Sequence, residues 1–284
     1  MTAPLFLIGA QRSGTTALGH ALSVAISEQH GGTFTVNGKL WYLLRRWLTA
    51  DDLAGRHLRA DEIIHALNRR PAQGSGASEW MTAAHGALAT AARAVAEGRY
   101  RADSEGVLTL ARDVAGEASG GKVWGDKYNE YLLDLDFLAA VFPDARWIML
   151  SRHPTEVAAS MLSWTGNRPW NPQTAADAEH KWAAWNQRWL DKRGQLDPRR
   201  VLELDYADLC SGEAHEELAQ FTDLSPATFI DLFSRPRPAV HDRPVGAGAA
   251  RVWASLRSSV GGATRPPGLS PAVSLAPIKP TDTT

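Results

Sequence analysis

The stretch Leu5–Leu18, LFLIGAQRSGTTAL, constrains the fold of this chain more than any other. Its first four residues form an apolar run that is too short for a helix and ends at Gly9, as is typical of a buried parallel strand. A turn of small residues follows, and apolar residues then recur at helical spacing from Ala17 to Ile26. A strand, a small-residue turn and a helix point backbone N–H groups and a helix N-terminus at one place. This geometry binds phosphates and other anions.

The turn departs from the nucleoside triphosphate loop, G-x-x-x-x-G-K-[ST], at one position. Gly9, Gly14 and Thr16 match the small and hydroxyl residues of that loop, but Thr15 stands where its phosphate-binding Lys should be. Arg12 is the only cation in the turn. We therefore expect a turn that holds a phosphate without the Lys that ATP and GTP chemistry uses. A glycine turn that binds nothing is the alternative.

Apolar or β-branched runs at residues 33–36, 122–125, 145–150 and 201–204 predict further strands, with helical patterns between them. This alternation predicts an α/β fold of three layers around a mostly parallel central sheet. We expect one domain over residues 1–234, with a helical insertion at about 50–120 that is suited to capping a substrate. Residues 235–284 are rich in Pro, Gly and Ser and are expected to form a partly disordered tail.

Charge and composition argue against a nucleic-acid-binding, a disulfide-bonded, a secreted and a membrane-spanning protein. A formal net charge of −1 over 284 residues gives no general attraction to nucleic acid or to an anionic membrane. Cys210 is the only cysteine, so an intramolecular disulfide is impossible. The chain enters its first strand without a signal peptide and holds no apolar run of membrane-spanning length. We therefore expect a cytoplasmic protein with no membrane span and no nucleic-acid partner.

Polar residues at the ends of the predicted strands are candidates for a site, because ligands of parallel sheets bind at the carboxyl ends of the strands. Arg152 follows one predicted strand, and Ser160 lies on the next helix. An Arg offers a forked pair of donors to a phosphate, and a Ser adds a neutral donor. Lys127 and Tyr206 follow two other strands. A surface Arg, a surface Lys and a core Tyr are the structural alternatives.

These segments resemble the sulfotransferases that use 3′-phosphoadenosine 5′-phosphosulfate (PAPS), in the branch that includes tyrosylprotein and many bacterial sulfotransferases. Arg12–Leu18 matches the R-S-G-T-T-x-L loop of that branch in full. Phe142–Pro154, followed by Ser160, matches F-P-x-A-x-x-I-x-x-x-R-x-P and its downstream Ser, which bind the 3′-phosphate in the family. Trp124–Lys127 matches the first part of W-G-[DE]-K-[ST]-P, and Tyr206–Leu209 is similar to Y-E-D-L.

The resemblance implies a P-loop NTPase-like fold and transfer of a sulfonate group from PAPS to a hydroxyl or amine of a small-molecule acceptor, with release of 3′,5′-ADP (PAP). It implies catalytic roles for Arg12 and Lys127, which would stabilise charge on the leaving phosphate. It implies no metal, because the sulfonate carries little charge for a Mg²⁺ ion to shield. The residues implied to bind PAPS or PAP are Arg12, Ser13, Gly14, Thr15, Thr16, Arg152, Ser160 and Tyr206.

The general base that takes the proton of the acceptor is harder to assign. Related enzymes often use a Glu or His after the first helix or beside the third strand. Asp126 adjoins Lys127 and is our first candidate, although an ion pair with Lys127 would lower its basicity. His30, at the end of the first helix, is the second candidate.

Two other functions stay open on the sequence. A P-loop kinase of small molecules would turn over ATP with magnesium, and Thr15 argues against it. A non-catalytic relative would keep the nucleotide site and lack a base. The acceptor is expected to be aromatic or amphipathic, from the Trp-rich segment at about 166–173 and the Ala-rich helices. The oligomeric state is not indicated.

Overall fold

The structure is a computed structural model that describes residues 3–164, 171–230 and 244–260. Within these residues the centre of the molecule is a five-stranded parallel sheet in the order β2-β3-β1-β4-β5. The strands are β1 (Leu5–Ile8), β2 (Thr33–Val36), β3 (Trp124–Lys127), β4 (Arg146–Ser151) and β5 (Val201–Asp205). The predicted α/β fold with a parallel central sheet is confirmed.

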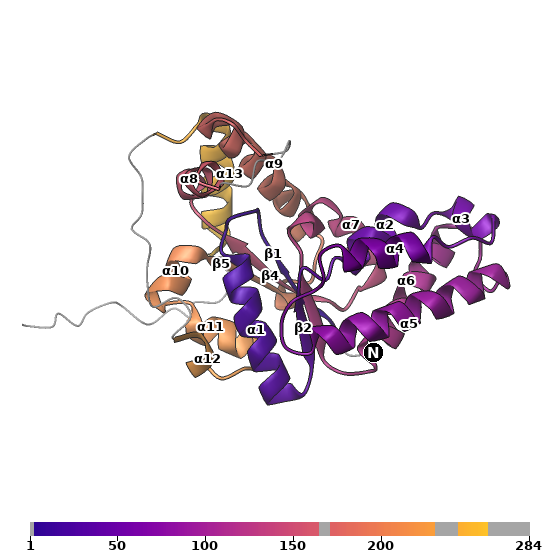
Figure 1. Ribbon diagram of the computed structural model, residues 1–284. Helices are drawn as coiled ribbons and strands as arrows, with labels where there is room; N and C mark the ends of the chain where they lie inside the picture. The colour runs from indigo at the N-terminus through magenta and orange to yellow at the C-terminus, as the bar shows by residue number, and fades with distance from the viewer. Residues whose placement is uncertain (1–2, 165–170, 231–243, 261–284) are drawn as a thin grey trace, which may run out of the picture.

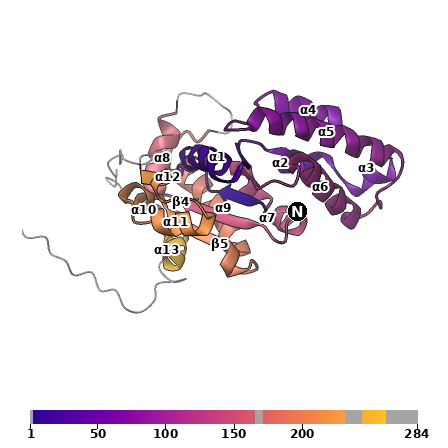
Figure 2. The same ribbon diagram turned by 90° about the horizontal axis from the view of Figure 1, so that it is seen from below.

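Helices cover both faces of the sheet, which gives the three layers (Figures 1 and 2). Successive side chains of a strand point to opposite faces, so β1 contributes to two separate cores. Leu5 and Leu7 lie in the core that the sheet shares with α1 (Thr15–His30), α11 (His215–Thr222) and α12 (Ala227–Ile230). Phe6 and Ile8 lie in a larger core on the other face, which is rich in aromatic residues. This core includes α2 (Leu40–Trp47), α7 (Leu135–Val141), α9 (Ala175–Arg193) and α13 (Ala247–Val260). Phe6 stacks on Trp147 with their ring centroids 5.1 Å apart.

Helices follow β1, β3, β4 and β5 in the chain and cover the two faces. They are α1 (Thr15–His30), α7 (Leu135–Val141), α8 (Pro154–Leu162), α9 (Ala175–Arg193), α10 (Tyr206–Ser211), α11 (His215–Thr222) and α12 (Ala227–Ile230). A 3₁₀ turn over Asn129–Leu133 precedes α7.

A helical arm extends to one side of the sheet between β2 and β3 (Figure 1). It consists of α2 (Leu40–Trp47), α3 (Ala50–Ala54), α4 (Ala60–Asn68), α5 (Ala77–Ala96) and α6 (Ser104–Ser119). The chain between α4 and α5 returns to the sheet, where the backbones of Val36 and Gln73 exchange hydrogen bonds of 2.8 and 2.9 Å. This bridge fixes the end of α4 beside the carboxyl end of β2.

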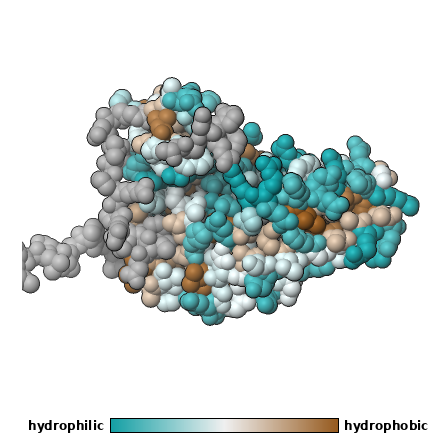
Figure 3. All heavy atoms as spheres, viewed as in Figure 1, coloured by the Kyte–Doolittle hydropathy of each residue, from teal (hydrophilic) through white to brown (hydrophobic). Residues whose placement is uncertain are grey.

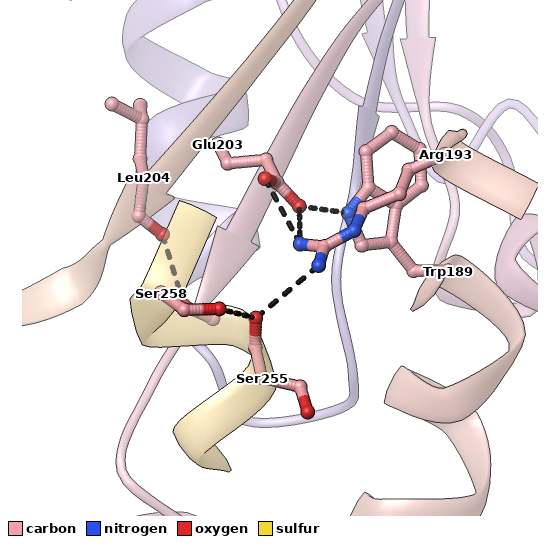
Figure 4. A network of polar contacts seen from close by, with 7 residues as sticks. Trp189, Arg193, Glu203, Leu204, Ser255 and Ser258 are labelled. Atoms are coloured by element: carbon pink, nitrogen blue, oxygen red, sulfur yellow. Dashed lines mark hydrogen bonds and ion pairs between the residues drawn. The ribbon is translucent and has the colours of Figure 1, made fainter. Parts of the chain in front are cut away.

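A helix lies where the sequence predicted part of a disordered tail. Residues 247–260 form α13 (Ala247–Val260), whose side chains Ala249, Val252 and Leu256 are buried in the aromatic core. Arg193 of α9 donates to both carboxylate oxygens of Glu203 in β5, at 3.1 and 3.2 Å, and to the carbonyl of Ser255 in α13, at 3.3 Å (Figure 4). This part of the chain therefore belongs to the domain, beyond the expected boundary at residue 234.

Some sequence predictions lie outside the described residues. They are the disorder expected at residues 235–243 and after residue 260, and most of the Trp-rich segment, at residues 166–170. In the part of the chain that is described, no helix is both long and apolar enough to span a lipid bilayer.

Candidate active site

The loop between β1 and α1 is pressed against two other strand ends, and it needs glycine at two positions. A Cβ atom at Gly9 would lie 2.5 Å from the carbonyl oxygen of Leu150 in β4. Gly14 has a left-handed φ of 94°, and a Cβ atom there would lie 2.5 Å from the Tyr206 ring that follows β5. Both contacts are shorter than any side chain tolerates, so the backbone approaches its neighbours where only glycine fits.

The N-terminus of α1 is open to a ligand. No side chain caps it, and the first N–H groups of a helix have no partner inside the helix. Arg12 has a left-handed φ of 69°, which helps to curl the loop so that these N–H groups converge. Ser13 is 0% exposed, and its hydroxyl has no hydrogen-bond partner among the described residues. An uncapped helix after a glycine turn is suited to a phosphate or sulfate group.

Lys127, the last residue of β3, supplies the cation that the loop lacks at Thr15. Its Nζ donates to Oγ1 of Thr16 at 3.2 Å and to Oδ1 of Asn129 at 2.8 Å. Asn129 in turn donates to the carbonyl of Gly9 at 3.1 Å, which ties β3 to the start of the loop. Lys127 is 2% exposed, and this burial lowers the pKa of its ammonium group to about 8. The predicted site residues Lys127 and Thr16 are thus brought together.

Arg152 lies on the other side of the loop, directly after β4, and is 8% exposed. Its Nε donates to Glu156 at 2.7 Å, and its Cζ lies 4.4 Å from the centre of the Tyr206 ring. One Nη contacts the backbone carbonyl of Arg12 at 3.5 Å. The guanidinium group is therefore held between an acid and an aromatic ring at the edge of the loop, as a preorganised anion-binding Arg requires.

Arg12 joins the loop to α8. Its Nε donates to Oγ of Ser160 at 3.0 Å. Four of the predicted ligand-binding residues, Arg12, Arg152, Ser160 and Tyr206, are thereby linked to one another by direct contacts on the β4–β5 side of the loop.

Asp126 occupies a position that does not suit the predicted general base. It precedes Lys127 in β3, so its side chain points to the opposite face of the sheet. The carboxylate is 0% exposed and accepts four hydrogen bonds. The donors are Oγ1 of Thr35 at 2.8 Å, N of Gly38 at 2.9 Å, N of Lys39 at 3.0 Å and the Tyr131 hydroxyl at 2.6 Å.

Burial raises the pKa of Asp126, while these four hydrogen bonds act to lower it. No acceptor can reach a carboxylate that is closed off in this way, so Asp126 organises the turn between β2 and α2 instead. His30 is also misplaced for catalysis. It lies at the far end of α1, where its ring contacts the carbonyl of Asp223 at 2.9 Å. At 1.5 Å per residue, a helix of this length separates the two ends by roughly 20 Å.

Glu130 was not singled out from the sequence. It lies in the 3₁₀ turn after β3 and lines a cavity of about 560 Å³ together with Gln11 of the loop and Lys181 of α9. Burial raises the pKa of the Glu130 carboxyl, against the opposing effect of the nearby Lys127. Glu130 lies three residues after the candidate Lys127, in the turn that follows a strand. This position is the sequence signal that could have identified it.

This fold and this site define a three-layer α/β protein whose first strand runs into a glycine turn and an uncapped helix, with Lys127 and Arg152 following the neighbouring strands. The chain belongs to the sulfotransferase family, since the family profile described as "Sulfotransferase family" matches residues 4–221. The resemblance inferred from the sequence is therefore confirmed at the level of the family. Sulfonyl transfer is accordingly the general chemistry of the group to which this protein belongs.

Solved structures with the same fold include two sulfotransferase domains. The "Sulfotransferase Domain from the Curacin Biosynthetic Pathway" superposes with a TM-score of 0.54 at 18% identity, covering 90% of this chain and 98% of that one. The "Sulfotransferase Domain from the Synechococcus PCC 7002 Olefin Synthase" gives a TM-score of 0.53 at 17% identity, covering 90% and 94%. At these identities the similarity concerns the fold alone. No curated protein matches the sequence.

Proposed function

We propose that this protein transfers a sulfonate group from PAPS to a hydroxyl or amine of a small-molecule acceptor and releases PAP. The observation that carries the proposal is the placement of cations on both sides of one anion-binding loop. Arg152 lies on the β4 side, and Lys127 lies on the β3 side. PAPS carries two separate anionic groups, its 3′-phosphate and its 5′-phosphosulfate, which correspond to two such positions.

The side chains fit both ends of this donor. Arg152 and Ser160 would bind the 3′-phosphate, because a forked guanidinium group and a hydroxyl lie together there through their shared contacts with Arg12. The N–H groups at the start of α1, with Lys127 and Thr16, would bind the 5′-phosphosulfate. Tyr206 packs against both Gly14 and Arg152, so it supports the loop and the Arg together.

We assign the role of general base to Glu130 in place of Asp126. Bound PAPS would supply the sulfonate and a phosphate leaving group. Glu130 takes the proton of the acceptor hydroxyl as the new bond from that oxygen to sulfur forms and the bond from sulfur to the bridging oxygen breaks. Lys127 stabilises the negative charge that the departing phosphate gains. The raised pKa of Glu130 favours this role, because a carboxyl of higher pKa is a stronger base.

The proposed function is tested by following the label from [³⁵S]PAPS in the absence of added metal. The protein is incubated with separate panels of phenols, alcohols and amines, and PAP release is measured in parallel. We expect label in one class of product, with one PAP released for each sulfonate transferred. Transfer of the γ-phosphate from magnesium ATP to members of the panel, without transfer from PAPS, would contradict the proposal and favour a kinase.

A further inference from the structure

A cavity of about 560 Å³ lies on the β2–β3 side of the loop. Gln11 of the loop forms one wall, and Tyr128 and Glu130, which follow β3, form another. Arg152 and Tyr206 follow β4 and β5, on the opposite side of β1. The cavity is therefore separate from the residues assigned to the 3′-phosphate, and it lies where an acceptor would meet Glu130.

Positive charge predominates around this cavity. Lys39, Arg69, Arg70 and Lys181 line it, against the carboxylate of Glu130. Figure 3 shows hydrophilic residues gathered on the surface between the arm and the group formed by α8, α9 and α13. A protein whose net charge is only −1 has no general excess of cations to account for this local concentration.

Lys39 is the most buried of these cations, with 9% exposed surface. Its backbone N–H donates to Asp126 at 3.0 Å, and its φ of 51° places it in the tight turn before α2. Burial lowers the pKa of Lys39, and the charges of Arg70 and Arg69 lower it further. The turn that Asp126 organises thus holds a lysine in a place that disfavours its positive charge until an anion binds.

Three of the cations around the cavity are unpaired in the part of the chain that the structure describes. There the side chains of Lys39, Arg69 and Arg70 form neither an ion pair nor a hydrogen bond. Arginines elsewhere on the arm do, since Arg99 pairs with Glu97 and Arg101 with Asp103, at 2.5 and 2.6 Å. The backbone bridge between Val36 and Gln73 holds the chain three residues after Arg70, so the cluster is anchored to the sheet.

The cavity also has an apolar and aromatic lining, formed by Leu43, Ala66, Tyr128 and Trp185. We propose that the acceptor of the sulfonate is itself an anion, a hydroxyl compound with an apolar or aromatic body whose phosphate or carboxylate group is held by Lys39, Arg69 and Arg70. Its hydroxyl then faces Glu130, which lines the same cavity. This inference rests on the proposed function, which supplies the donor and the base.

The test uses the full chain saturated with PAP, so that the donor site is already filled. Phenyl phosphate, phenylacetate and benzyl alcohol share an aromatic body and differ in charge, and each is titrated calorimetrically at low salt. The variant R69Q/R70Q removes two of the clustered charges, and R99Q/R101Q removes two charges from another exposed part of the arm as a matched control. PAP affinity is measured first for each protein.

We expect one of the two anions to bind the wild type at least about tenfold more tightly than benzyl alcohol does. The tighter anion identifies the group as a phosphate or a carboxylate. R69Q/R70Q should abolish this preference, and R99Q/R101Q should keep it. Equal binding of the neutral alcohol, no measurable binding of either anion, or an unchanged preference in R69Q/R70Q would overturn the inference. Failure of the wild type to bind PAP would instead contradict the proposed function.

Discussion

The Nε atom of Arg12 donates a 3.0 Å hydrogen bond to Oγ of Ser160, although 148 positions separate the two residues in the chain. The bond joins the loop between β1 and α1 to the helix that follows β4, and the backbone carbonyl of Arg12 also contacts Arg152. It shows how the two ends of the proposed donor site are kept in a fixed relation. A ligand that bridges the two ends would therefore find its partners already in place.

Ser160→Ala should weaken PAP binding by at least about tenfold, which corresponds to the loss of one hydrogen bond to a charged group. The variant loses a donor to the proposed 3′-phosphate and also frees Arg12. These effects are separated by titrating the wild type and the variant with PAP and, separately, with 5′-AMP, which lacks the 3′-phosphate. Equal weakening for both ligands would show that Ser160 acts only through Arg12.

Lys127 should make PAP binding depend on pH above neutrality. Its pKa is lowered to about 8 by burial, so it is protonated at pH 7 and mostly neutral at pH 9. Binding of the 5′-phosphate favours the charged form, and the affinity for PAP should therefore fall by up to about tenfold from pH 7 to pH 9. Lys127→Met should bind PAP more weakly at pH 7 and lose this dependence. If the affinity of Lys127→Met for PAP still fell between pH 7 and pH 9, another group would be responsible for the pH dependence.

Asp126→Asn should destabilise the protein rather than act on the chemical step alone. The amide group cannot accept all four hydrogen bonds that converge on the carboxylate. We expect the free energy of unfolding to fall by about 3 kcal/mol in chemical denaturation. Unchanged stability together with complete loss of sulfonate transfer would restore Asp126 as the base.

Glu130→Gln should lower kcat by about 100-fold or more, the usual contribution of a general base. PAP affinity and thermal stability should change little, because Glu130 lies in the cavity on the acceptor side of the loop. In the wild type, kcat/KM should rise with pH as Glu130 loses its proton, with a midpoint above the usual carboxyl range because burial raises its pKa. The variant should lose this rise. A normal rate in Glu130→Gln would exclude Glu130 as the base.

The loop and the parallel sheet were predictable from the sequence because both depend on local patterns. Gly9 and Gly14 mark the turn, and short apolar runs mark the strands. β3 was predicted two residues too early, at 122–125, because Asp126 and Lys127 are unusual residues for a buried strand. The pairing of Thr35 with Asp126 and of Val36 with Lys127 extends the strand and sends the two charges to opposite faces.

Contacts between distant segments were not predictable in this way. Nothing local shows that Lys127 meets Thr16, or that Asp126 caps the turn before α2. α13 did leave a signal, since Ala249, Val252, Trp253 and Leu256 recur at helical spacing. The Pro, Gly and Ser content around that segment obscured it.

The most direct test of the account is calorimetric titration of PAP without metal, for the wild type, Arg152→Ala and Arg146→Ala. Arg146 lies at the opposite end of the same strand, where it stacks on Phe221, and serves as the matched control. We predict micromolar binding to the wild type and to Arg146→Ala, and binding about 100-fold weaker to Arg152→Ala. No binding of PAP to the wild type, with binding of ATP in the presence of Mg²⁺, would contradict the assignment of PAPS as the donor.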